Sequence, residues 1–207
     1  MIKSPLLFFS LISTLFFSQK NDATLYFKSG KVLSGKADMI LNSETKVRFK
    51  DSQQNRTEKV KFDDLHKIEY FENGSETPIT FERKEVIWRK GKPKLENVWL
   101  SKLDEGEITY YISKNFYDGY SNMSTGNTMT PTTFTSYFFQ YQNQKPELIY
   151  YLIDKRGVKN EKEILGYLEP FFKNTCPQLI EEYKSGKLKM IKDPKPLLDF
   201  YNQNCRK

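Results

Sequence analysis

Residues 23–72 read ATLYFKSGKVLSGKADMILNSETKVRFKDSQQNRTEKVKFDDLHKIEYFE. Apolar residues recur at every second position in short runs, the pattern of strands that bury one face. Ser29-Gly30 supplies a turn in which glycine takes positive φ at little cost, and Gly35 marks a bulge or a close approach of two backbones. We therefore predict five short strands in a small barrel-like unit over residues 20–72. The alternating runs hold Leu25 and Phe27, Val47 and Phe49, Val60 and Phe62, and Ile68 and Tyr70.

The order of these signals resembles an Sm-type or SH3-like small barrel. The resemblance rests on FKSGKVLSGKA (27–37) and VKFDDLHKIEY (60–70). It implies a closed five-stranded unit, in which closure removes exposed sheet edges. Sm-like proteins often bind RNA, but the stretch holds no loop that matches their RNA-contacting loop. We therefore expect no nucleic-acid partner.

The N-terminus has the pattern of a secretion signal. A positive Met1-Ile2-Lys3 precedes the apolar run PLLFFSLISTLFF (5–17), which is shorter than the roughly 20 residues that cross a bilayer. We expect residues 1–19 to be a signal peptide, with cleavage before Gln19 or, alternatively, at Ala23. The mature chain is then exported to the periplasm or cell surface, and we expect no transmembrane span in it.

Residues 73–157 continue the strand-and-turn pattern and predict a β-meander. Asn73-Gly74 is a two-residue hairpin signal, and the run LIYYLI (148–153) is apolar on both faces. A strand of that kind belongs in the middle of a sheet or under a covering layer.

Residues 115–136, NFYDGYSNMSTGNTMTPTTFTS, interrupt the meander. Long loops are often functional, and tyrosine with Ser, Gly and Asn is typical of adaptable binding loops. The alternative is a hairpin tip without a ligand. The candidate ligand-binding residues are Tyr117, Tyr120, Asn122, Asn127 and Phe134.

The periodicity becomes helical in residues 158–207. Asn160 and Glu163 have capping-box spacing, and Pro170 predicts a kink or a break in the first helix beside Glu169. Pro177 opens a second helix that ends near Gly186, and a third begins after Asp193. The predicted fold class is α+β, with an antiparallel β-rich body, a small barrel or a meander sheet, followed by two to three short helices.

Cys176 and Cys205 are the only cysteines of the 207-residue chain. An exported protein meets oxidising conditions, and antiparallel second and third helices would bring the two residues together, so we predict a disulfide. Two buried free thiols are the alternative. The segments FFKNTCPQLIEEY (171–183) and LLDFYNQNC (197–205) resemble uncharacterised exported proteins of Gram-negative bacteria with a Cys-paired helical tail, which implies a location rather than an activity.

The charge balance is basic, with 33 Lys and Arg against 26 Asp and Glu. A basic balance suits an anionic partner or plain solubility. Because no long run of basic residues occurs, the pattern favours a solvated surface over a dedicated basic patch.

Few residues suggest chemistry. His66, the only histidine, follows Asp63-Asp64 and is interpreted as a surface turn residue rather than part of a metal or acid–base site. Asp104, Glu105 and Glu107 could form a carboxylate pair, but they surround Gly106 as a solvated turn would. We predict no catalytic residue, metal or cofactor. The expected function is a non-catalytic envelope protein that binds an envelope protein or glycan; the alternative is a hydrolase of envelope polysaccharide.

Overall fold

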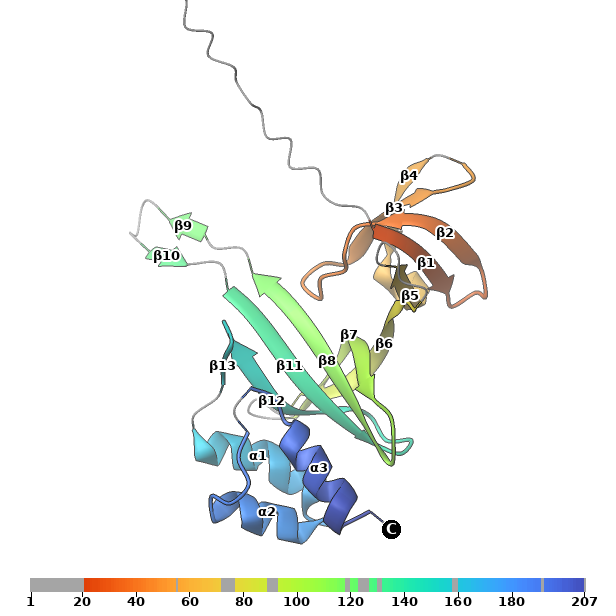
Figure 1. Ribbon diagram of the computed structural model, residues 1–207. Coiled ribbons are helices and arrows are strands. Elements are labelled where there is room, and N and C mark those ends of the chain that lie inside the picture. The colour runs from red at the N-terminus through yellow and green to blue at the C-terminus, as the bar shows by residue number, and fades with distance from the viewer. Residues whose placement is uncertain are drawn as a thin grey trace, which may run out of the picture.

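The computed structural model describes residues 21–54, 56–71, 77–88, 93–117, 120–122, 127–129, 132–157, 160–190 and 192–206. One 11-stranded sheet runs through the chain in the order β13-β12-β11-β8-β7-β6-β5-β1-β2-β3-β4, and a small second sheet pairs β9 with β10. Three helices follow the strands (Figure 1). The predicted fold class, an antiparallel β-rich body with a short helical tail, is confirmed. The predicted turn at Asn73-Gly74 lies outside the described residues.

The five predicted strands of the first unit are present. They form a curled antiparallel sheet in the order β5-β1-β2-β3-β4, with a 3₁₀ turn, η1, between β4 and β5. Inward side chains such as Leu25, Phe49 and Ile68 are fully buried. The elements are β1 (Asn21–Phe27), β2 (Val32–Ala37), β3 (Lys46–Asp51), β4 (Thr57–Lys61), η1 (Phe62–Asp64) and β5 (Leu65–Phe71).

Both glycines of the first unit have the predicted roles. Gly30 has a φ of +85° in the turn between β1 and β2. At Gly35, a Cβ atom would stand 2.1 Å from the Lys50 carbonyl oxygen and 2.8 Å from the Phe49 ring. The close packing of β2 on β3 therefore depends on a residue without a side chain.

The remaining strands close on themselves. β6 to β8, β11 and β12 pair in that order, all antiparallel, and β12 then meets β6 in a parallel contact at Glu147 and Ile87. Ile87 N–H also donates to the Pro146 carbonyl at 2.8 Å. The elements are β6 (Ile79–Trp88), β7 (Lys94–Asp104), β8 (Ile108–Tyr117), β9 (Tyr120–Asn122), β10 (Asn127–Met129), β11 (Thr132–Tyr141), β12 (Glu147–Ile153) and β13 (Arg156–Gly157).

Two features connect the first unit to the ring formed by β6, β7, β8, β11 and β12. Strand β6 pairs with β5 of the first unit, and one aromatic side chain of the ring lies in the core of the first unit. β6 pairs with β5 at its start and with β7 over the rest of its length. Trp99, on β7, is 1% exposed and belongs to the core of the first unit, edge-to-face against Phe62. Arg83 lies over both rings, 5.7 Å from each centre, and its guanidinium pairs with Asp63 at 3.2 Å.

The segment 115–136 is not one continuous loop. β8 extends to Tyr117 and β11 begins at Thr132, so both ends of the segment are paired strands, and β9 and β10 form a short hairpin beyond them. Ser136, within the segment, is 1% exposed. The described residues of the expected loop therefore lie in paired strands rather than in a loop.

The helical tail has α1 (Glu161–Phe172), α2 (Pro177–Lys184) and α3 (Lys195–Asn204). Asn160 caps α1 by accepting from Glu163 N–H, as predicted. Of the two alternatives predicted at Pro170, the break is wrong: α1 continues to Phe172, since a proline in the last turn removes only one helical bond. The capping box is also incomplete, because the Glu163 carboxylate instead accepts from Tyr151 and Tyr167.

The helices pack on the outward face of β8, β11 and β12, where Figure 1 shows them gathered under one end of the sheet. The predicted burial of residues 148–153 is confirmed for Leu148 to Leu152. One face of β12 packs against the helices, of which α1 contacts it, and the other face packs in the interior of the ring of strands. The predicted Cys176–Cys205 disulfide is also present and joins the start of α2 to the end of α3. Among the described residues, no helix has the length and apolar character needed to cross a bilayer.

Candidate functional site

The strongest candidate surface lies on the outside of β2, β3 and β4. Every second residue of these strands points inward, so the alternate residues share the outer face. Six of those outer residues are basic, and we call this surface the basic face. Its members are Lys36, Lys46, Arg48, Lys50, Lys59 and Lys61.

The strand register places these cations directly opposite one another. Lys46 is paired with Lys61 and Arg48 with Lys59 across β3 and β4. Lys36 is likewise opposite Lys50 across β2 and β3. Like charges in such positions destabilise a sheet by roughly 0.2–1 kcal/mol per pair. The fold thus carries three repulsive cross-strand pairs on one surface.

Nearby carboxylates neutralise only part of this charge. Asp22 pairs with Lys36 at 3.1 Å, and Asp38 pairs with Arg48 at 2.6 Å. The other four lysines make no ion pair with any carboxylate of the described residues. They are Lys46, Lys50, Lys59 and Lys61.

A hollow of about 470 Å³ opens on the basic face. Lys46, Arg48 and Lys59 line it, together with the carboxylates of Asp38 and Glu44 and the hydroxyl-bearing Ser43 and Thr45. The hollow combines cations with hydroxyl groups, the groups that bind oxyanions in proteins. An anionic group of a ligand would meet Lys46, Lys59 and the Asp38-paired Arg48 there.

The basic face was not predicted from the sequence. The basic residues look dispersed along the chain, because no two of Lys46, Arg48 and Lys50 are adjacent. Period-two alternation puts them on one face of a strand, and the register then adds the lysines of β4 and β2. The signal was the repeated pattern of a basic residue at every second position in KVRFK (46–50) and KVK (59–61).

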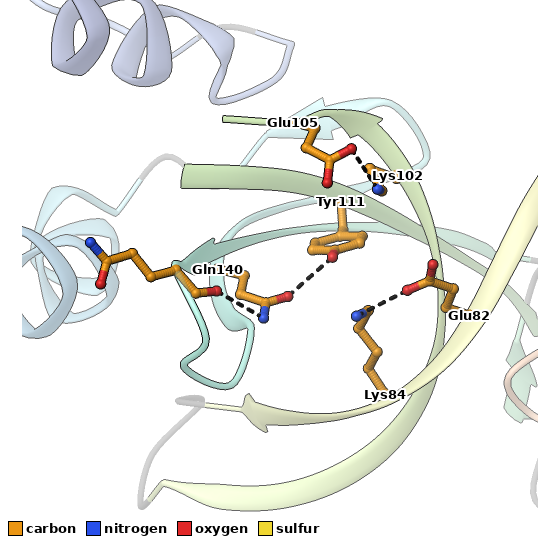
Figure 2. A network of polar contacts seen from close by, with 7 residues as sticks. Glu82, Lys84, Lys102, Glu105, Tyr111 and Gln140 are labelled. Atoms are coloured by element: carbon orange, nitrogen blue, oxygen red, sulfur yellow. Dashed lines mark hydrogen bonds and ion pairs between the residues drawn. The ribbon is translucent and has the colours of Figure 1, made fainter. Parts of the chain in front are cut away.

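A second polar cluster lies where the two parts of the sheet diverge. Lys84 is bonded to Glu82 at 2.9 Å, Lys102 is bonded to Glu105 at 2.8 Å, and the Tyr111 hydroxyl donates to Gln140 at 3.0 Å (Figure 2). Next to it, a hollow of about 470 Å³ is lined by Pro78, Ile79, Thr80, Glu82, Ser101 and Lys102. The charged residues of its lining, Glu82 and Lys102, are already paired with Lys84 and Glu105.

The pairing limits what this second cluster can do chemically. Burial lowers the pKa of Lys84, but its hydrogen bond to Glu82 and the nearby Tyr111 outweigh that effect, and the pKa ends above its ordinary value. Lys84 therefore stays an ammonium group and cannot serve as a base or amine nucleophile near neutral pH.

The carboxylates considered for hydrolysis are separately engaged. Glu105 has a lowered pKa because Lys102 bonds to it and attracts its charge, whereas a general acid needs a raised pKa. Asp104 accepts from the Glu105 backbone N–H, and Glu107 accepts from the Tyr141 hydroxyl. His66 is exposed, as expected, but it lies on strand β5 rather than in a turn, edge-on to Tyr26. The described residues hold no group of three or more metal-ligating side chains.

The five predicted ligand-binding residues are spread along the long hairpin. Tyr117 ends β8, Tyr120 and Asn122 bound β9, and Asn127 opens β10, where it is paired with Asn122. Phe134, on β11, is half-buried and stacks on Tyr151. Its side chain therefore packs against the apolar core inside the closed set of strands. The structure brings the two asparagines together, while Phe134 belongs to the packing.

Comparison of the chain with protein-family models, curated proteins and solved structures finds no match.

Proposed function

We propose that this protein is an exported, non-catalytic binding module that holds an anionic ligand on its basic face. The observation that carries the proposal is the set of three cross-strand pairs of like charge. Asp22 and Asp38 each offset one cation of these pairs, but Lys46, Lys50, Lys59 and Lys61 have no carboxylate partner among the described residues, and a bound anion would relieve the remaining repulsion. This surface replaces the 115–136 segment as the proposed binding site.

Export is supported by two features. The apolar N-terminal run has the pattern of a secretion signal, and the Cys176–Cys205 disulfide suits an oxidising compartment such as the periplasm or cell surface. A non-catalytic role is supported by the second polar cluster, whose lysines and glutamates are bonded to each other rather than to an open reaction site.

Retention on immobilised anions tests the proposal. The wild type, a K46Q/K59Q/K61Q variant and a K162Q/K173Q/K189Q variant are eluted by a salt gradient from phosphate-, carboxylate- and sulfate-bearing matrices. The second variant removes the same charge from exposed positions of the helical tail. We expect the first variant to elute at clearly lower salt than the second, because binding depends on the local density of cations. Coincident elution of the two variants would refute the basic face as the binding site.

A further inference from the structure

We propose that the ligand of the basic face is a linear acidic glycan that lies along β3. This inference rests on the proposed function and names the class of its ligand. It follows from the spacing of the cations, the curvature of the sheet and the residue types on its outer face.

The cations form a ladder rather than a single cluster. Lys46, Arg48 and Lys50 follow one another along β3 at intervals of roughly 6.8 Å. Lys61 and Lys59 flank this row on β4, and Lys36 flanks it on β2, each roughly 4.8 Å away in the strand-to-strand direction. A small anion can reach only a few of these groups. A chain with regularly spaced negative charges can contact the whole ladder.

The curvature of the sheet argues for a flexible chain rather than a membrane. Strands β1 to β5 curl around a common core (Figure 1). The residues of the basic face alternate with the buried ones, so they lie on the convex outside of that curl. A flat bilayer would touch such a surface along a narrow line. A polymer can bend over it and enter the hollow between Lys46, Arg48 and Lys59.

The outer residues also argue against a single-stranded nucleic acid. Proteins that bind such strands stack bases on exposed aromatic rings. The outward positions of β2, β3 and β4 carry no aromatic residue; Phe49, between them, is fully buried. The Tyr26 ring, on the neighbouring strand β1, is covered by Lys67 of β5, whose Nζ lies 3.7 Å from the ring centre. Among the described residues, the outward positions of β2, β3 and β4 therefore offer bases no ring on which to stack.

Lysine predominates over arginine on this face, which suits charge density rather than bidentate recognition of one group. Lysine is a compact point charge on a flexible stem, whereas arginine fixes two oxygens of one anion at once. Arg48 is the exception, and Asp38 already accepts from its Nε at 2.6 Å. The face can therefore follow carboxylates or sulfates along a chain without matching each one individually.

Titration calorimetry tests the assignment with four probes at equal concentration of negative charge. They are polygalacturonate, monomeric galacturonate, polyuridylate and vesicles of phosphatidylcholine with one-quarter phosphatidylglycerol; neutral dextran serves as the blank. We expect polygalacturonate to bind most tightly and its affinity to fall steeply with salt. In K46Q/K59Q/K61Q the affinity should drop at least roughly tenfold and the salt slope should become shallower. K162Q/K173Q/K189Q should stay close to wild type.

The outcomes separate this inference from the proposed function. Tighter binding of polyuridylate or of the vesicles would overturn the glycan, while the basic face would stand as an anion site. Equal binding of monomeric and polymeric galacturonate would overturn the linear chain. If none of the probes binds and retention on anionic matrices is also unchanged in K46Q/K59Q/K61Q, the proposed function itself fails.

Discussion

Asn42 binds the backbone of Trp99 with both ends of its side-chain amide. Its Oδ1 accepts from Trp99 N–H at 2.6 Å, and its Nδ2 donates to the Trp99 carbonyl at 3.2 Å. Nδ2 also donates to the Ser113 hydroxyl at 2.8 Å. The connection between β2 and β3 thus reaches two strands of the ring, and the Trp99 side chain fills the core of the first unit in return.

Asn42→Ala should lower the free energy of unfolding by about 1–3 kcal/mol, because it leaves partly buried backbone groups of Trp99 unpaired. Urea unfolding followed by tryptophan fluorescence measures the change. Asn202→Ala, at an exposed position of α3, is the matched control and should be neutral or slightly stabilising, because alanine has the higher helix propensity. Equal stability of the two variants would mean that Asn42 does not hold the two parts together.

The basic face makes a prediction about stability in the absence of any ligand. Lys61→Gln removes the like charge opposite Lys46, so it should raise the free energy of unfolding by roughly 0.2–1 kcal/mol at low salt. The gain should vanish near 1 M salt, where the Debye length is about 3 Å. Chemical denaturation at the two ionic strengths decides the matter. A gain that persists at high salt would have a cause other than charge repulsion.

The raised pKa of the Tyr151 hydroxyl predicts that the free energy of unfolding falls at alkaline pH. Burial and the hydrogen bond to Glu163 raise its pKa to about 12, above the usual value of 10.0. A raised folded-state pKa adds stability below the unfolded pKa, and that stability is lost as the pH rises from 10 toward 12. Tyr151→Phe should be less stable than wild type at pH 8 by about 1 kcal/mol.

The difference between wild type and Tyr151→Phe should narrow above pH 10, by at most about 1.4 kcal/mol per pH unit. Urea denaturation at pH 8, 10 and 11 follows it. A gap that stays constant, or widens, over that range would show that the folded state does not hold this phenol in its neutral form.

Local sequence signals predicted the local structure well. The alternation of Leu25 and Phe49 with polar neighbours specified inward and outward faces, Gly35 specified a close approach of strands, and Asn160 specified the start of α1. Each of these depends on a residue's own backbone or its nearest neighbours. The disulfide could also be predicted, because the chain has only two cysteines and they lie at helix ends that an antiparallel arrangement brings together.

The pairing and register of strands that lie far apart in the chain could not be predicted from the sequence. The parallel contact of Glu147 with Ile87 joins strands 60 residues apart, and no turn signal specifies it. The same holds for the basic face, since a shift of register by one residue would have placed the β4 lysines elsewhere. The passage of Trp99 into the core of the first unit likewise follows from the shared strand β6 and not from any local pattern.

The pairing of strand β1 favours one of the two predicted cleavage positions of the signal peptide. Cleavage after Ala23 would remove a buried residue that is paired with both Gly35 and Tyr70, together with Asp22, the ion-pair partner of Lys36. Cleavage before Gln19 keeps the whole strand from Asn21 onward. N-terminal sequencing of the exported protein should therefore begin at or before Asn21.

A chain engineered to begin at Thr24 should, by the same reasoning, be less stable than one that begins at Gln19, because it lacks the first three residues of β1 and exposes the core beneath Ala23. The loss of one buried methyl and of the strand pairing at these positions should cost at least about 1 kcal/mol. Comparison of their melting temperatures measures it. If the shorter chain is equally stable, or if Met1 is retained on the protein in the cytoplasm, this account of export and processing is wrong.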